Sequence, residues 1–286
     1  MRISYNKLWK MLIDKDMNKR DLAEKSGVSS ASIAKLSKGA NITTDVRLWV
    51  VTSRIFLRPL TTEGGRLSMP KSNIVELNKD TPSVQYLCKK CKRLAKVIEM
   101  VGPIQYTTHD EDAYTFLVHE IIEQMLSVKV GQKIYNRLEE LCGGEVSPDR
   151  ICAFSDEQIR GTGTSNAKVE YIRNITNAIT DGTLDLETLK QLSDEEVITA
   201  LTKIRGIGNW TAKMYLIFGL DRQDVLPIED GAFLQVYRWM YKTKDCSERA
   251  VTAKCKKWKP YSSVASRFCY RALDAGMTKE EFHLFK

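Results

Sequence analysis

The stretch of sequence that decides the fold reads LTKIRGIGNWTA and occupies residues 201–212. Its Gly206-Ile207-Gly208 triplet permits a tight turn in which the backbone can approach a phosphate group closely. A helix that begins at Asn209 would aim its free N–H groups at that phosphate. We expect Ile207 to pack between the two flanking helices. The stretch therefore predicts two helices joined by a phosphate-binding hairpin.

Two acidic residues follow the hairpin in the stretch LPIEDGAF, residues 226–233. A proline followed by an acid at the start of a helix can hold a carboxylate in a fixed place near the hairpin. Glu229 and Asp230 are both candidates, and the register against Pro227 and the following helix favours Asp230. The other interpretation of Asp230 is a helix N-cap with no further role.

Apolar residues recur at helical spacing along almost the whole chain, and no alternating pattern is strong enough to predict a sheet. We therefore predict an all-α fold. Residues 46–60 differ, because they are rich in β-branched and aromatic residues without a helical face. The predicted helices after this segment are 82–101, 113–128, 131–142, 148–152, 155–160, 164–181, 185–190, 194–202, 208–219, 229–242, 247–257 and 260–274.

The charge of the 286-residue chain is uneven. Lys and Arg number 44 and Asp and Glu number 36, which gives a net charge of +8. Residues 1–71 hold 14 basic and 6 acidic residues and so account for all of it. The segment 238–271 is basic again, with ten Lys or Arg against two acids. Two basic segments indicate contacts with nucleic acid phosphates, and two solvated surfaces are the alternative interpretation.

Several classes of protein are excluded by the composition. No run of about 18 uncharged apolar residues is present, and no signal-peptide core follows Met1. Seven cysteines in a long chain do not suit a disulfide framework, so we expect a reducing cytoplasm. No phosphate-binding Walker loop, dinucleotide fingerprint or Ser/His/Asp pattern appears, and we expect no required cofactor.

Residues 17–37 read as a helix, a short turn and a second helix. Ala23 is small where the helices would cross, Gly27 lies at the turn, and Val28 and Ile33 are core positions. The segment resembles the helix-turn-helix of Cro/repressor-like regulators over about residues 3–45. In that family the second helix enters the major groove of DNA. The residues that would contact bases here are Ser29, Ser30, Ser32 and Lys35.

The alternative for this segment is a small helical module that contacts another protein. Residues 46–60 depart from the resemblance, because repressor domains continue into a fourth and fifth helix at this point. The module is then either truncated or completed by the following domain. We predict a helix-turn-helix at 1–45, an irregular linker at 46–72 and a second domain at 73–286.

The second domain resembles the helix-hairpin-helix DNA glycosylases, in particular the DNA-3-methyladenine glycosylase II family. Departures from the family pattern are Glu123, where glycine is usual, and Glu229-Asp230-Gly231, where the family often has G-D-L. The landmarks that match in order are IEQMLS at 122–127, GTSNAKVEYI at 163–172, the hairpin with Asp230, and WKPYSSVAS at 258–266.

The resemblance implies hydrolysis of the N-glycosidic bond of an alkylated purine in base-excision repair. An alkylated purine is positively charged and already leaves easily, whereas the sugar develops oxocarbenium character that a fixed carboxylate stabilises. Asp230 matches that carboxylate. Trp210 stands where bifunctional relatives have a Schiff-base lysine, which implies a monofunctional enzyme without lyase activity.

Further site residues are implied by the same resemblance. An aromatic pocket suits a cationic base, and its candidates are Trp210, Tyr270 and, more weakly, Tyr114. Met125, with Gln124, matches the wedge that fills the gap left by an extruded base. Tyr270 and Met125 also remain open as core residues. The hairpin residues expected to contact DNA are Arg205, Gly206, Ile207, Gly208 and Thr211, and the carbonyls expected to hold a monovalent cation (Na⁺ or K⁺) are those of Thr202, Ile204 and Ile207.

The implied partner is double-stranded DNA that contains a damaged base, and the implied state is a monomer in a prokaryotic cytoplasm, associated with the nucleoid. Cys246, Cys255 and Cys269 lack the spacing of the iron–sulfur cluster that some relatives carry. A second functional interpretation is a transcriptional regulator whose glycosylase-like domain binds DNA without catalysis.

Overall fold

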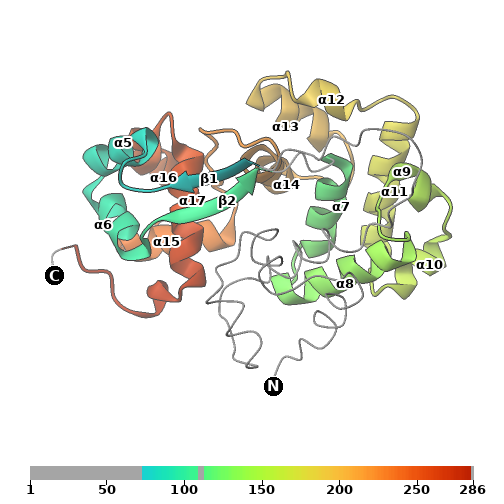
Figure 1. Cartoon of the computed structure of the whole chain (residues 1–286), viewed down its shortest axis with the longest axis horizontal. Helices are drawn as coiled ribbons and strands as arrows, with labels where there is room; N and C mark the ends of the chain where they lie inside the picture. Colours follow the sequence, from blue (N-terminus) through green and yellow to red (C-terminus); the bar gives the residue numbers. More distant parts are fainter. Residues whose placement is uncertain (1–72, 109–112, 285–286) are drawn as a thin grey trace, which may run out of the picture. The chain divides into compact units, whose positions relative to one another are not determined.

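Two hydrophobic cores organise the residues that the computed structural model describes, 73–108 and 113–284. Residues 113–225 form the central lobe around one core. Residues 73–108 and 226–284 together form the terminal lobe around the other (Figure 1). Because the chain leaves the terminal lobe and later returns to it, residues far apart in the sequence meet where the lobes join.

The whole chain divides into two compact units, Met1–Leu67 and Ser68–Lys286, and both lobes belong to the second unit. The predicted base contacts Ser29, Ser30, Ser32 and Lys35 lie outside the described residues. Across residues 73–108 and 113–284, no helix is long and apolar enough to cross a membrane.

The central lobe is entirely helical. Serine side chains start several of its helices by accepting a backbone N–H, as sequence preferences for N-caps predict. Its elements are α7 (Ala113–Glu123), α8 (Val128–Leu141), α9 (Pro148–Cys152), α10 (Asp156–Gly161), α11 (Asn166–Thr180), α12 (Leu186–Leu189), α13 (Asp194–Thr202), α14 (Asn209–Met214) and the π-helix η1 (Tyr215–Gly219).

The terminal lobe packs its helices around α17, which contacts α5, α6 and α15 and is buried along most of its length. Its elements are β1 (Asn73–Leu77), α5 (Pro82–Lys90), α6 (Lys92–Val101), β2 (Ile104–Thr108), α15 (Gly231–Tyr241), α16 (Glu248–Cys255), the 3-10 turn η2 (Lys256–Trp258), α17 (Ser262–Asp274) and the 3-10 turn η3 (Met277–Lys279).

The predicted helical fold is confirmed, but the prediction that no sheet forms is wrong. Strands β1 and β2 pair antiparallel, with Val75 opposite Tyr106 and Leu77 opposite Ile104. The strands are only five residues long. An exposed Ile74 also hides the alternation that would have revealed β1.

Two predicted helices are shorter than the apolar spacing suggests. The helix predicted for 82–101 breaks at Cys91, which is extended and whose Sγ accepts the backbone N–H of Leu94 as an N-cap. The helix predicted for 113–128 ends at Glu123, because Met125 adopts a left-handed backbone with φ of 58°. That early end creates a loop that is central to the site described below.

Tyr114 of α7 lies in the core of the central lobe. Its side chain is 1% exposed. The Thr176 hydroxyl donates to the carbonyl of Ile172 at 2.6 Å, so the Tyr114 hydroxyl donates to the Thr176 oxygen at 2.7 Å. Burial raises the pKa of Tyr114, which keeps the hydroxyl protonated as a donor. The expectation that Tyr114 lines a ligand pocket is therefore corrected to a core role.

We expect Tyr114→Phe to lower the free energy of unfolding by about 1 kcal/mol, because one buried hydrogen bond is lost while the ring stays. Tyr114→Ala should cost about 3–5 kcal/mol through the cavity it leaves. Urea denaturation followed by circular dichroism measures both. A cost below about 1 kcal/mol for Tyr114→Ala would contradict a core role.

Candidate functional site

Asp230 lies at the join between the two lobes. It is the N-cap of α15, where Oδ1 accepts the backbone N–H of Phe233 at 2.6 Å. Its Oδ2 accepts the indole N–H of Trp210, on α14 of the central lobe, at 2.7 Å. The residue is 8% exposed. Each carboxylate oxygen thus has one donor, and the carboxylate is held between two lobes rather than only capping its own helix.

The neighbouring carboxylate faces a different partner. Both oxygens of Glu229 accept from Lys213 Nζ at 2.9 Å. The Lys213 side chain is 15% exposed and that of Glu229 is 33% exposed. Glu229 is therefore engaged by an ion pair, and Asp230 is the acid that contacts the indole of Trp210.

Tyr270 projects from α17 beside Asp230. Burial raises the pKa of Tyr270, and the nearby charge of Asp230 raises it further, so the phenol is neutral at physiological pH. Its ring lies 5.8 Å from that of Phe218 in η1, centroid to centroid. Trp210, Asp230 and Tyr270 are thus brought together from both lobes, with Phe218 as an aromatic neighbour that the sequence did not reveal.

A serine pair fixes the helix that carries Tyr270. At the start of α17, Ser262 donates its hydroxyl to Asp224 Oδ1 at 2.6 Å. The hydroxyl of the next residue, Ser263, accepts the backbone N–H of Val225 at 2.9 Å. These contacts tie α17 to the segment that leaves η1. They give a physical reason for the two serines in the landmark WKPYSSVAS, residues 258–266.

Arg267, one turn before Tyr270, is a buried cation. It donates to the carbonyl of Ile217 at 2.6 Å and to Asp221 at 2.8 Å. The guanidinium lies 3.8 Å from the Tyr106 ring centroid and 4.9 Å from that of Phe218. The sequence placed Arg267 among cations that contact phosphate. That interpretation is wrong, because the side chain is 8% exposed and already paired.

The hairpin between α13 and α14 has the predicted turn. Gly206 has a φ of 108°, and a Cβ on it would lie 2.2 Å from the Tyr171 ring. Gly208 is extended, with a φ of −98°, and a Cβ there would meet open space. Ile207 is 4% exposed and packs in the central core, as predicted.

Of the other hairpin residues expected to contact DNA, Arg205 lies on the surface and Thr211 in the interior. Arg205 is exposed and pairs with Glu170. Thr211 is 1% exposed, and its hydroxyl accepts from Gln124 Nε2 at 3.2 Å. The Thr211 side chain therefore faces the protein, and the expected DNA contact of this residue stays a prediction that only its backbone can meet.

The loop after α7 is clamped to the hairpin. Gln124 Nε2 also donates to the carbonyl of Gly206 at 2.9 Å. Lys168 Nζ donates to the carbonyls of Ile122 at 2.8 Å and Gln124 at 2.7 Å, which satisfies the end of α7. Within this clamp Met125 is fully exposed. Gln124 thus positions the loop, and Met125 is the side chain that projects from it.

Lys168 is a functional residue that the sequence signalled only through its place in the GTSNAKVEYI landmark. Burial lowers its pKa, although the charge of Glu123 opposes that shift. The lysine also lines a recess of about 390 Å³ beside Met125, together with Leu126, Ser165 and Tyr171. One short motif therefore supports both the projecting loop and the hairpin.

A helix-hairpin-helix placed beside a buried carboxylate and an exposed apolar loop residue defines a class of DNA-binding enzymes. The chain belongs to the HhH-GPD superfamily of base excision DNA repair proteins, whose family model matches residues 118–260. Residues 7–46 match the Cro/C1-type helix-turn-helix DNA-binding domain.

Relatives agree with this assignment. The chain is 31% identical over 172 residues to DNA-3-methyladenine glycosylase 1 of Schizosaccharomyces pombe, covering 59% of this chain and 75% of the relative. A crystal structure of a DNA-3-methyladenine glycosidase from Bacillus halodurans is 34% identical, with a TM-score of 0.65, covering 73% of this chain and 97% of that one.

A Schizosaccharomyces pombe 3-methyladenine DNA glycosylase solved with abasic DNA is 27% identical, with a TM-score of 0.63, and covers 67% of this chain and 96% of that one. The present chain is accordingly a DNA-binding glycosylase of base-excision repair, a hydrolase of the N-glycosidic bond.

The two hairpin glycines should respond differently to a methyl group. Gly206→Ala should destabilise the protein, because its Cβ meets the Tyr171 ring and its φ is left-handed. Gly208→Ala should fold as the wild type but bind duplex DNA more weakly, because the methyl group holds the backbone away from the phosphate.

Thermal unfolding and fluorescence anisotropy with a lesion-free duplex separate the two effects. Equal DNA affinity for Gly208→Ala and the wild type would mean that this face of the hairpin does not touch DNA.

Proposed function

We propose that this glycosylase removes alkylated purines of the 3-methyladenine type from duplex DNA and leaves the abasic strand uncut. The observation that carries the proposal is the buried Asp230 carboxylate held by the Trp210 indole N–H at 2.7 Å. The names of the relatives, which are 3-methyladenine glycosylases, support the substrate class.

Asp230 stabilises the positive charge that the sugar develops as the base leaves. An alkylated purine already carries positive charge, so the bond needs little acid catalysis. The donors from Trp210 and Phe233 fix the carboxylate in place before the reaction. A fixed charge in a site with little solvent acts more strongly than a solvated one and requires no reorganisation.

The absence of strand cleavage follows from the side chains near Asp230. An indole cannot form a Schiff base, and Trp210 occupies the hairpin position concerned. Lys213, the nearest lysine on α14, is bound by both oxygens of Glu229. The Lys213 amine is therefore engaged by a carboxylate and is directed away from a role as the nucleophile.

The base pocket is the aromatic group made by Trp210, Tyr270 and Phe218. Aromatic faces attract a cationic base through their quadrupoles. Met125 enters the gap left in the duplex, since it is exposed and its backbone is clamped by Gln124 and Lys168.

A monovalent cation is part of the proposed hairpin. Its ligands would be the backbone carbonyls of Thr202, Ile204 and Ile207, and such oxygen donors suit Na⁺ or K⁺. The Ile204 carbonyl accepts the N–H of Ile207 at 3.0 Å and keeps a second lone pair. The ion would supply positive charge opposite a DNA phosphate. We propose that the enzyme requires no other cofactor and acts as a monomer in the cytoplasm.

The test of this function compares the adjacent acids. Asp230→Asn keeps the shape and, through its one amide oxygen, the cap of α15. It removes the charge, and its amide nitrogen no longer accepts the indole N–H of Trp210. We expect single-turnover base release from methylated duplex DNA to fall by about 10²- to 10³-fold, with DNA binding retained. Glu229→Gln is the matched control. Its effect on the rate of base release should be mild, because the substitution breaks only the ion pair with Lys213.

Loss of activity in Glu229→Gln with full activity in Asp230→Asn would reverse the assignment of the acid. Wild-type rates in both variants would favour the second interpretation, a regulator that binds DNA without catalysis.

We also propose that the N-terminal segment binds duplex DNA through Ser29, Ser30, Ser32 and Lys35. The match of residues 7–46 to a Cro/C1-type domain supports this. Lys35→Gln should lower the slope of log affinity against log salt by about 0.9, the value of one phosphate contact. Lys10→Gln removes the same charge elsewhere and should change the slope less. Equal slopes for Lys35→Gln and the wild type would contradict the contact.

A further inference from the structure

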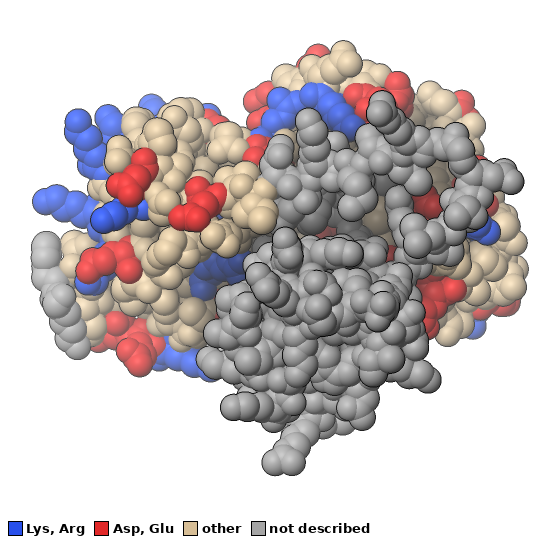
Figure 2. Space-filling model, in the orientation of Figure 1, with Lys and Arg blue, Asp and Glu red and all other residues tan. Residues whose placement is uncertain are grey.

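Two segments of the terminal lobe are strongly basic and meet in space. Residues 81–98 hold five Lys or Arg and no acid, and residues 249–259 also hold five and no acid. In the fold α5 contacts η2, and α6 contacts both α15 and α17. Figure 2 shows positive side chains gathered over α5 and α6 at the outer end of this lobe.

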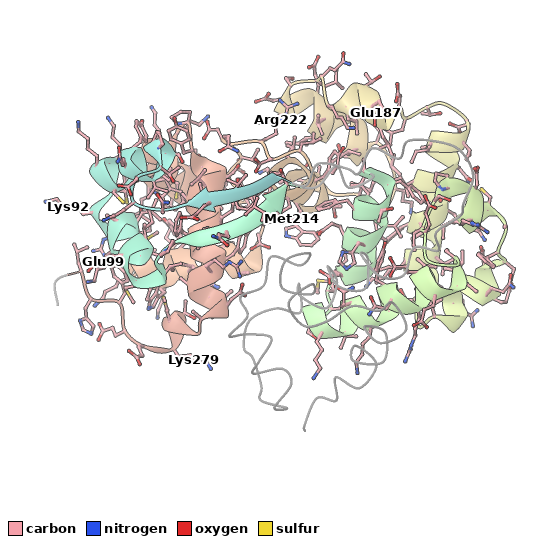
Figure 3. All side chains as sticks on the ribbon, viewed as in Figure 1. Lys92, Glu99, Glu187, Met214, Arg222 and Lys279 are labelled. Atoms are coloured by element: carbon pink, nitrogen blue, oxygen red, sulfur yellow. The ribbon has the colours of Figure 1, made fainter. Side chains whose placement is uncertain are left out.

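The Tyr241 ring, at the last position of α15, is the point where the segments join. Lys257 Nζ lies 5.8 Å from its centroid and the Arg93 guanidinium 6.0 Å. We define the basic surface as the six side chains of Lys89, Lys90, Lys92, Arg93, Lys256 and Lys257. Five of them are exposed, Arg93 is half-buried, and Lys92 projects at the outer end of the lobe (Figure 3).

The charge of the basic surface is not neutralised by the protein. Among residues 73–108 and 113–284, none of its six side chains forms an ion pair, whereas Lys96 pairs with Glu99 and Lys259 with Asp224. Lys254 lies close enough to Asp245 to lower the pKa of that acid, and it is therefore left out of the surface. The remaining positive charge faces solvent.

Local helix stability does not explain this placement. Lys89 and Lys90 lie in the last turn of α5, where cations are favourable. Lys92 and Arg93, however, lie in the first turn of α6, which contains no acid. Arg93 donates to the carbonyl of Met240 at 2.7 Å, whereas Lys92 is exposed. Positive charge there opposes the helix dipole and repels its neighbours in α5. Because positive charge at this position is unfavourable for the helix, its presence indicates that the surface binds an anion from outside the protein.

We propose that the basic surface binds the phosphate backbone of duplex DNA that flanks the damaged base. The large apolar side chains exposed in the described ranges lie elsewhere, so the surface offers no apolar anchor for a protein or membrane. A polyanion bound by charge alone needs none. The proposal rests on DNA binding by the hairpin and does not depend on the assignment of Asp230.

The distance to the site suits flanking DNA. Helix α15 begins next to Asp230 and ends at Tyr241, and its 11 residues span about 16 Å at 1.5 Å per residue. Successive phosphates of one strand rise by about 3.4 Å along the duplex axis, so this length corresponds to about five base pairs. The surface therefore lies within reach of the backbone roughly half a helical turn from the lesion.

The test uses the full chain and duplexes of two lengths that carry a stable abasic analogue. Lys92→Gln/Lys257→Gln removes one cation from each segment. On a duplex of about 25 base pairs we expect the salt slope to fall by about 1.8, the value of two phosphate contacts. On a hairpin-closed duplex that ends about three base pairs from the lesion we expect no change.

The matched control is Arg160→Gln/Lys190→Gln, which removes two charges from the central lobe and should leave both slopes as in the wild type. Single-turnover base release at saturating enzyme should be unchanged in both double variants. Loss of release with unchanged slopes would bear on the catalytic proposal and not on this one.

An unchanged slope on the long duplex would overturn the proposal. An equal fall on both duplexes would also overturn it, because it would indicate long-range attraction rather than a flanking contact. Loss of binding to anionic lipid vesicles, with DNA affinity retained, would assign the surface to a membrane instead.

Discussion

The hydrogen bond between the Trp210 indole and the Asp230 carboxylate is the contact on which the rest of the site depends. It joins α14 of the central lobe to the start of α15 in the terminal lobe. A carboxylate that is 8% exposed must find donors inside the protein. Its two donors come from different lobes, so its position depends on both. The N-terminal end of α14 and the carboxylate are thereby separated by a single side chain.

Helix α11 also holds parts of the same site in place. Lys168 and Tyr171 lie one turn apart on it, and so on one face. Lys168 donates to the carbonyls at the end of α7, next to Met125. Tyr171 packs against Gly206. The Gln124 amide then closes the link between the loop and the hairpin. The hairpin and the loop that carries the exposed Met125 are therefore fixed by one helix, and a shift of either would strain the other.

Sequence reasoning found the residues whose chemistry requires a particular type. The hairpin glycines and Asp230 were predicted from turn geometry and charge, whereas the role of Trp210 was implied by the family resemblance. Sequence reasoning failed where the role of a side chain depends on the residues that pack against it. Tyr114 reads like a pocket residue, yet its hydroxyl bonds to Thr176, which is 62 positions away.

The sequence also did not show in which direction a side chain points. Thr211 follows the hairpin as a DNA contact would, but it turns inward to Gln124. Helix ends were overestimated at Cys91 and Glu123, because apolar spacing continues through both breaks. The strands were missed because five residues with an exposed isoleucine show too little alternation. For Thr211 and for the paired strands, the deciding partner is distant in sequence.

Two cations near the pocket are paired with acids. Arg267 is balanced by Asp221 at 2.8 Å, and Lys213 is balanced by Glu229 at 2.9 Å. The Tyr270 phenol is neutral. Asp230 remains, with neutral N–H donors on both oxygens. The Asp230 carboxylate thus places negative charge next to aromatic faces. In the proposed reaction, that charge attracts a cationic purine before the bond breaks, and it stabilises the sugar cation after the positive charge has moved from the base.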